Sequence, residues 1–183
     1  MILGLDISTS STGWSVLGSD GTLIEQSYIR LDKINNTILK VSEIHSVLNY
    51  LKEKYEIKHI FIEENLQMFR PGLSSAKTLI TLARFNGMVT LDSYNVFNIE
   101  PNFLNVNSAR KLVGLKIDRK DKSSSTKEKV LNWVDNNLNK EFLWPIKILK
   151  SGPRKGTEVY ENGCYDIADA YVIALAGYKI LNN

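Results

Sequence analysis

The sequence is poor in the residues that build zinc sites and disulfides. Among its 183 residues are one cysteine, Cys164, and two histidines, His45 and His59. A single cysteine excludes a disulfide within the chain and suits a reducing compartment such as the cytoplasm. The same scarcity excludes a zinc site built from thiolate and imidazole ligands. We therefore expect a cytoplasmic protein without a zinc site of this kind.

Long apolar runs are absent as well. No stretch approaches the roughly 18 apolar residues of a membrane helix, and residues 1–5 run into Asp6 without the pattern of a signal peptide. We therefore expect no membrane partner. Hydrophobic residues make up 43% of the chain and charged residues 23%, which is typical of a folded protein. The length predicts a single domain over residues 1–183, and a net charge of +3 permits a polyanionic partner without requiring one.

The order of the predicted elements indicates an α/β fold. Three strands come first and form an antiparallel meander, because Asp20-Gly21 is a strong hairpin turn. The expected elements are strands at 2–7, 12–17 and 22–31, a helix at 36–55, a strand at 58–64, a helix at 75–91, a strand between 95 and 106, a short helix at 108–113, a helix at 125–138 opened by a capping box of Ser125 and Glu128, and a closing helix at 163–181. Residues 140–162 are left open between a loop and a small hairpin. This order predicts a five-stranded mixed sheet, the antiparallel meander plus parallel strands, flanked by helices.

Acidic residues occur where a chain that only builds a core would not place them. Asp6 ends the first strand, Glu63 ends the apolar strand of residues 60–62, and Asp166 and Asp169 share one face of the last helix. Buried carboxylates are costly unless cations or hydrogen bonds compensate them. Oxygen ligands suit Mg²⁺ or Mn²⁺. The pattern predicts that these four acids are catalytic residues that bind two metal ions and support phosphodiester hydrolysis.

Each of these acids also has a plainer interpretation. Asp6 fits a turn residue at a strand end, and Glu63 or Glu64 fits a solvated strand end. Asp166 lies in the first turn of its helix, where a negative charge is stabilising. The plain interpretation is weakest for Asp169, which has apolar neighbours in the sequence. The ordered set favours a shared site more than any single residue does.

Three segments carry a resemblance to a known family. Residues 2–16 place Asp6 before a small-residue turn and a Thr-Gly-aromatic strand, residues 60–64 form an acidic strand, and residues 165–174 contain an Asp-x-x-Asp-Ala helix. In this order the segments resemble the RuvC family of Holliday junction resolvases, in the RNase H-like superfamily. The resemblance implies an RNase H-like fold and a Mg²⁺-dependent endonuclease. It aligns Glu63 with the catalytic Glu of that family.

The resemblance also implies partners. A RuvC-like protein would be a homodimer that cuts two strands of a four-way DNA junction, with the helix at 75–91 in the dimer interface; an ordinary core helix is the alternative. The family carries an aromatic wedge after its catalytic Glu, whereas Leu66 stands near that place and Met68 and Phe69 follow. Phe69 is therefore a candidate DNA contact. The short, divergent form resembles phage-encoded members, which would act in the bacterial or phage-infected cytoplasm.

Basic residues cluster in two segments. Residues 110–129 hold eight cations against three acids: Arg110, Lys111, Lys116, Arg119, Lys120, Lys122, Lys127 and Lys129 against Asp118, Asp121 and Glu128. A second cluster consists of Lys147, Lys150, Arg154 and Lys155. Clustered cations bind DNA phosphates, although any one lysine can be merely solvated. In the first cluster the predicted DNA-binding residues are Arg110, Lys111, Lys116, Arg119, Lys120, Lys122 and Lys127. Lys127 also follows the pattern of the RuvC family.

Other functions compete with a junction nuclease. An ATPase or sugar kinase of the actin-like superfamily has a similar first loop, but it needs two domains and leaves Asp166 and Asp169 unexplained. A DNA-binding module without catalysis leaves all four acids unexplained. A nuclease of the same fold that cuts flaps or RNA–DNA hybrids differs only in its substrate, and the sequence separates these substrates poorly.

Overall fold

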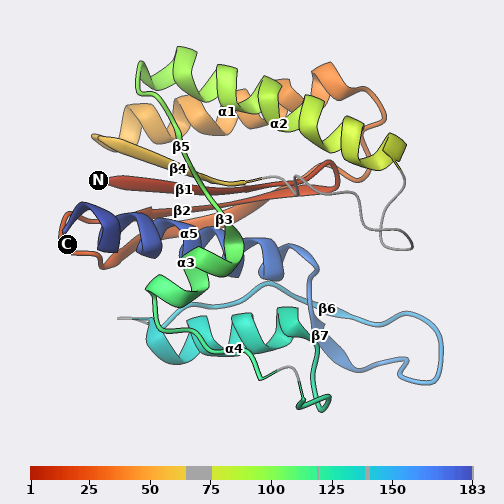
Figure 1. The fold of residues 1–183 in the computed structure, drawn as a ribbon. Coiled ribbons are helices and arrows are strands. Elements are labelled where there is room, and N and C mark those ends of the chain that lie inside the picture. The colour runs from red at the N-terminus through yellow and green to blue at the C-terminus, as the bar shows by residue number, and fades with distance from the viewer. Residues whose placement is uncertain (65–75, 119, 139–140, 183) are drawn as a thin grey trace.

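The computed structural model of the protein describes residues 1–64, 76–118, 120–138 and 141–182. A five-stranded sheet lies between two helical layers (Figure 1). Its strands are β1 (Ile2–Ile7), β2 (Ser11–Leu17), β3 (Leu23–Arg30), β4 (His59–Glu63) and β5 (Asn102–Leu104). They are ordered β3-β2-β1-β4-β5, with antiparallel pairing among the first three and parallel pairing between β1, β4 and β5. The predicted α/β fold with a mixed five-stranded sheet is confirmed.

Helices α1 (Thr37–Lys54) and α2 (Ala76–Phe97) cover one face of the sheet. Leu3 and Leu5 of β1 point to this face and belong to the same apolar cluster as Leu48 of α1 and Phe85 of α2. Asn36 caps α1, since its side chain accepts hydrogen bonds from the backbone N–H groups of the first turn. Among the described residues, no helix has the length and apolar character needed to cross a membrane.

The other face is covered by α5 (Gly163–Leu181), and α3 (Val106–Leu112) and α4 (Thr126–Asn137) pack against α5. Helix α5 lies directly on β1 and β2, and glycines make this close approach possible. A Cβ atom on Gly4 would lie 2.4 Å from the carbonyl oxygen of Ala170, and one on Gly13 would lie 2.0 Å from that of Asp166. The glycine of the Thr-Gly-aromatic segment therefore allows the acidic turn of α5 to contact the sheet.

A small hairpin of β6 (Ile146–Ile148) and β7 (Glu158–Tyr160) lies beside α4. It resolves the choice that the sequence left open for residues 140–162. The capping box is also confirmed, because Ser125 and Glu128 exchange side chain and backbone hydrogen bonds at the start of α4.

Two predicted helix boundaries were wrong. Helix α2 extends to Phe97 rather than 91, because Ser93 and Val96 continue its buried face. The helix stops there because the next residue, Asn98, has a left-handed φ of 56°. Strand β5 therefore begins only after Pro101, and the segment from 95 to 101 is not part of it. Helix α3 starts at Val106 rather than 108, since Asn105 provides its cap.

Candidate active site

The ends of two parallel strands bring the first two predicted acids together. Strands β1 and β4 pair in a register that sets Leu5 beside Ile62, so Asp6 and Glu63 follow at the same edge of the sheet. Helix α5 crosses this edge with Asp166 and Asp169. All four carboxylates line one cavity of about 650 Å³, here called the acidic cavity. The sequence-predicted acids are thus neighbours in the structure, and their catalytic role stays a prediction.

Burial and repulsion from neighbouring acids make the carboxyl groups of Asp6, Glu63 and Asp166 hard to ionise. Burial raises the pKa of Asp6 well above its usual range, and the charges of Glu63, Asp169 and Asp166 raise it further. Burial, followed by repulsion from Asp169, raises the pKa of Glu63 to about 7. Burial also raises the pKa of Asp166, although a hydrogen bond from Ser11 opposes this. Such a group of acids would be stabilised by added positive charge.

Two cations of the protein supply part of that charge. Arg110 Nη2 of α3 lies 3.0 Å from Asp169 Oδ1, and Lys127 Nζ of α4 lies 3.8 Å from Asp166 Oδ1. The Lys127 ammonium group also lies 5.8 Å from the centre of the Tyr165 ring. Arg110 was expected to bind DNA, but here its guanidinium group contacts a predicted metal ligand.

The donor set suits a hard divalent cation in its chemistry, since all four ligands are carboxylates. Among the described residues, however, no three acidic, histidine or cysteine side chains are arranged to hold a metal ion. Asp166 is instead paired with Lys127 and Asp169 with Arg110, so each cation contacts an oxygen that a metal ion would need. The site therefore fits a metal if these contacts are exchanged for it.

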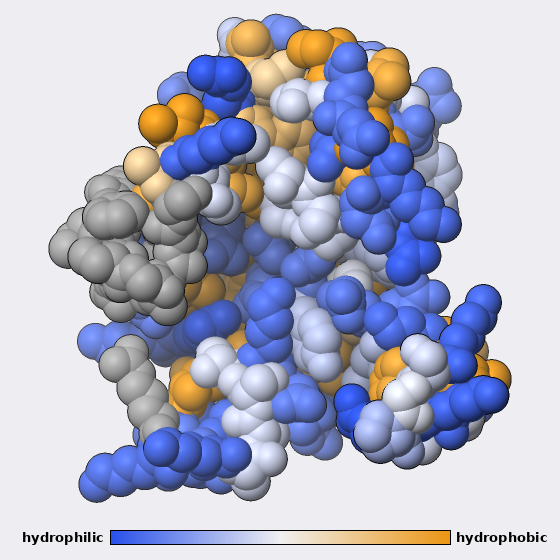
Figure 2. Space-filling view, turned by 90° about the vertical axis from the view of Figure 1, so that its right-hand side faces the viewer, coloured by the Kyte–Doolittle hydropathy of each residue, from blue (hydrophilic) through white to orange (hydrophobic). Residues whose placement is uncertain are grey.

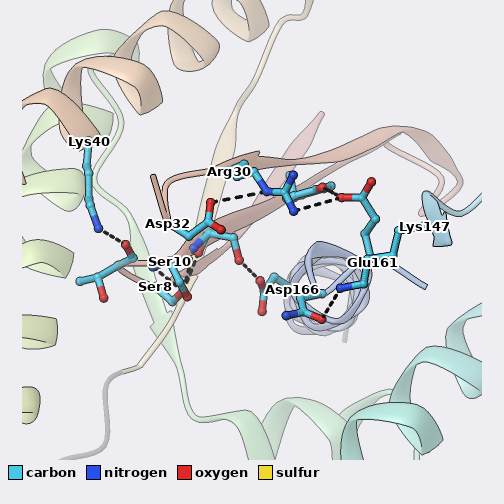
Figure 3. A network of polar contacts seen from close by, with 12 residues as sticks. Ser8, Ser10, Arg30, Asp32, Lys40, Lys147, Glu161 and Asp166 are labelled. Atoms are coloured by element: carbon cyan, nitrogen blue, oxygen red, sulfur yellow. Dashed lines mark hydrogen bonds and ion pairs between the residues drawn. The ribbon is translucent and has the colours of Figure 1, made fainter. Parts of the chain in front are cut away.

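The turn between β1 and β2 forms another wall of the acidic cavity. The Ser8 hydroxyl donates to the Ser11 carbonyl oxygen at 2.7 Å, and Ser11 donates a hydrogen bond to Asp166. Lys40 of α1 donates to the carbonyl oxygen of Thr9 (Figure 3). The sequence analysis missed these supporting roles. The small-residue turn was visible in the sequence, but nothing in it indicated that Ser11 would contact Asp166.

Only some of the predicted DNA-binding residues lie beside the acids. Lys127 and Arg110 line the acidic cavity itself. Lys111 and Lys116 line a smaller pocket of about 240 Å³ at the end of α3, which Arg110 shares. Lys120 and Lys122 are exposed in the segment before α4. Arg119 and Phe69 lie outside the described residues, as do Leu66 and Met68.

The surface is hollowed between the α1–α2 layer and the part that holds α4 and the hairpin (Figure 2). Mostly hydrophilic residues face this hollow. A mixed sheet of this order, with acids at the ends of β1 and β4 and on the closing helix, defines the RNase H-like class of fold.

Within that class, the chain has the fold of the RuvC resolvases. It superimposes on Thermus thermophilus RuvC in complex with a Holliday junction substrate with a TM-score of 0.65 and 15% identity, over 99% of this chain and 94% of that one. RuvC from the same organism gives a TM-score of 0.63 at 14% identity, over 99% and 95% of the two chains. The yeast mitochondrial Holliday junction resolvase gives 0.54 at 18% identity, over 97% and 77%. No protein-family model and no curated protein matches the sequence.

Proposed function

We propose that the protein is a RuvC-type endonuclease that cuts four-way junctions, and other branched DNA, in recombination and repair. The observation that carries this proposal is the acidic cavity, where Asp6, Glu63, Asp166 and Asp169 meet on a fold shared with junction resolvases. We also propose that it is a phage-type enzyme of the bacterial or infected-cell cytoplasm.

The four carboxylates would hold two Mg²⁺ or Mn²⁺ ions. When bound, such ions acidify a water molecule and offset the negative charge on the leaving oxygen. Other parts of the protein hold these carboxylates in position. Ser11 holds the Asp166 carboxylate by a hydrogen bond, while the neighbouring sheet holds Asp6 and Glu63 at one edge. Arg110 and Lys127 neutralise the acids before a metal binds, and they are free to contact phosphate once it has.

Cationic side chains around the acidic cavity suit a DNA backbone. Lys127 of α4 is exposed at its rim, and Lys111 and Lys116 continue the positive surface along the end of α3. These residues would position the phosphates without reading the sequence. Clustered cations also make the affinity fall as salt is added.

A homodimer through α2 would supply the second active site that a symmetric cut needs. Several large apolar residues of α2 and β5 are exposed, namely Ile80, Leu91, Tyr94 and Phe103. Leu91, Tyr94 and Phe103 border a hollow of about 730 Å³, where Gly87 leaves open space. A face of this kind is typical of a protein interface rather than a solvated helix.

The test offers purified protein a four-way junction, a flap, a linear duplex and an RNA–DNA hybrid of matched sequence, with Mg²⁺. Paired nicks at symmetric positions of the junction are expected, and a chelator should abolish them. Cleavage that continues in chelator would exclude the metal mechanism. Preferred cutting of the hybrid or the flap would retain the nuclease and reassign its substrate, and binding of ATP without cleavage would exclude a nuclease.

A further inference from the structure

A second large cavity lies beside the acidic one. It has a volume of about 750 Å³ and is bounded by α4, by the β6–β7 hairpin with its connecting loop, and by the start of α5. We call it the hairpin cavity. It is not needed for the proposed chemistry, because none of the four acids lines it.

The two cavities share a wall. Asn162 and Tyr165, at the start of α5, line both the acidic cavity and the hairpin cavity. A DNA strand with one phosphate among the acids would therefore extend directly into the hairpin cavity. This continuity points to a neighbouring part of the same substrate as the occupant.

The lining of the hairpin cavity combines positive charge with apolar surface. Lys147 of β6 and Arg154 of the connecting loop provide cations, while Ile146 and Tyr160 form a cross-strand pair of half-exposed apolar side chains. Figure 2 views the molecule from the side of this loop and shows hydrophobic residues among hydrophilic ones in its lower part. An aromatic ring beside cations is the combination that binds single-stranded nucleic acid.

Two acids also line the hairpin cavity, and they weaken its positive charge only in part. The Glu128 carboxylate accepts a hydrogen bond of 2.7 Å from the backbone N–H of Ser125 in the capping box. Glu158 is exposed on β7, opposite Ile148. The volume of about 750 Å³ lies within the range of roughly 300–1,000 Å³ that small-ligand sites occupy.

The side chain of Asn162 does not form the hydrogen bond expected from its position in the helix. It is the N-cap residue of α5, where asparagine normally accepts a backbone hydrogen bond, yet its side chain makes no such bond. Its Oδ1 accepts instead from Lys147 Nζ at 3.3 Å, which links the hairpin to the wall between the two cavities. Figure 3 shows Lys147 near Glu161 and Asp166 at this end of α5.

We propose that the hairpin cavity binds one unstacked nucleotide of the cleaved strand, next to the phosphate held among the acids. Its base lies against Tyr160 and Ile146, and its phosphate lies near Lys147 and Arg154. The inference rests on the proposed function and adds a source of selectivity to it. A branch point offers an unstacked nucleotide at little cost, whereas a continuous duplex must first be unstacked.

The test is a double-mutant cycle between the DNA base and the protein. A base-free nucleotide is placed in turn at each of the positions flanking the cut in a four-way junction, and cleavage rates are measured for wild type and Tyr160→Ala. At one position, loss of the base should slow the wild type about 5- to 100-fold, the range of one base–aromatic stacking contact. Tyr160→Ala should slow cleavage of the intact junction similarly and show no further loss at that position.

Matched variants separate this role from general DNA affinity. Ile146→Ala should behave like Tyr160→Ala, whereas Ile148→Ala, on the same strand but outside the cavity lining, should keep the wild-type response to base removal. Lys155→Ala should weaken binding equally for all these substrates, as a phosphate contact does. If the slowing caused by base removal and the slowing caused by Tyr160→Ala multiply at every position, the inference is wrong. Cleavage of the unmodified junction by wild type would still support the proposed function.

Discussion

Arg110 Nη2 lies 3.0 Å from Asp169 Oδ1, and both side chains are largely buried, with 16% and 10% of their surfaces exposed. An arginine thus occupies a position among the carboxylates that are proposed to hold metal ions. Its Nε atom is buried without a hydrogen-bond partner among the described residues. The pair is therefore incompletely satisfied, which suits a contact that is exchanged when a metal ion binds.

Removal of Arg110 should destabilise the protein in the absence of metal. Arg110→Ala leaves Asp169 buried without its partner, and the loss of one member of a buried pair costs about 3 kcal/mol. Because each kcal/mol shifts Tm by about 2–4 °C in a domain of this size, thermal unfolding in chelator should show a drop of several degrees. Added Mn²⁺ should recover much of it. The exposed neighbour Lys111→Ala is the control, and an equal drop for both variants would contradict the compensating role of Arg110.

The four acids are expected to be essential for cleavage but not for DNA binding. Asp6→Asn, Glu63→Gln and Asp169→Asn each remove a negative charge from the acidic cavity, so junction cleavage should fall by more than the roughly 10- to 100-fold typical of changes around a metal site. Gel-shift affinity for the junction should persist. Glu56→Gln changes an exposed acid outside the cavity and should cleave normally. Loss of folding together with binding in the first three variants would contradict the catalytic assignment.

The raised pKa of Glu63 predicts how stability depends on pH in the absence of metal. The unfolded chain loses this proton near pH 4.5, whereas the folded protein keeps it up to about pH 7. The folded state therefore binds more protons between these values, and its stability falls as pH rises from 4.5 to 7 and then levels off. Glu63→Gln cannot ionise at this position. In chelator, wild type should lose a few more degrees of Tm than Glu63→Gln between pH 5 and pH 8, and identical losses would contradict the pKa of about 7.

Local signals were sufficient to predict much of the fold. The Asp20-Gly21 turn, the capping box of Ser125 and Glu128 and the closing helix at 163–181 each depend on residues close in sequence, and all three were confirmed. The end of α2 was missed because Asp92, Ser93 and Asn95 interrupt the apolar pattern, yet Ser93 and Val96 occupy buried positions along the helix. Tertiary packing decided that boundary.

The candidate site was predictable as far as its acids, but not as far as their contacts. Asp6 and Glu63 could be placed together because parallel strands end at one edge. The contact of Arg110 with Asp169 joins residues 59 positions apart, and the contact of Ser11 with Asp166 joins residues 155 apart. No spacing rule connects such pairs. The same holds for the hairpin cavity, whose wall is made by α4, β6, β7 and α5 together.

Gly13 should be indispensable because α5 lies so close to β2. Gly13→Ala would place a Cβ atom 2.0 Å from the carbonyl oxygen of Asp166, so either the helix or the strand must shift. Because Gly13 pairs with Asp6 across the sheet, the shift should separate Asp166 from Asp6. We expect a large loss of both Tm and cleavage. Gly87→Ala in α2 meets nothing within 4 Å and should raise stability by about 0.5–1 kcal/mol. Normal cleavage by Gly13→Ala would contradict this packing argument.

If α2 forms the proposed dimer interface, a charge placed on its exposed face should prevent dimerisation. Leu91 is 61% exposed on α2, so Leu91→Lys should leave the fold intact while it places a charge in the interface, where desolvation opposes association. Analytical ultracentrifugation should show a dimer for wild type and a monomer for this variant. Ile38 of α1 is also 61% exposed, and Ile38→Lys should stay dimeric. A monomeric Leu91→Lys variant with an intact active site should nick the two strands of a junction independently, since nothing holds two acidic cavities on one substrate. If wild type and Leu91→Lys sediment alike, the interface does not lie on this face of α2.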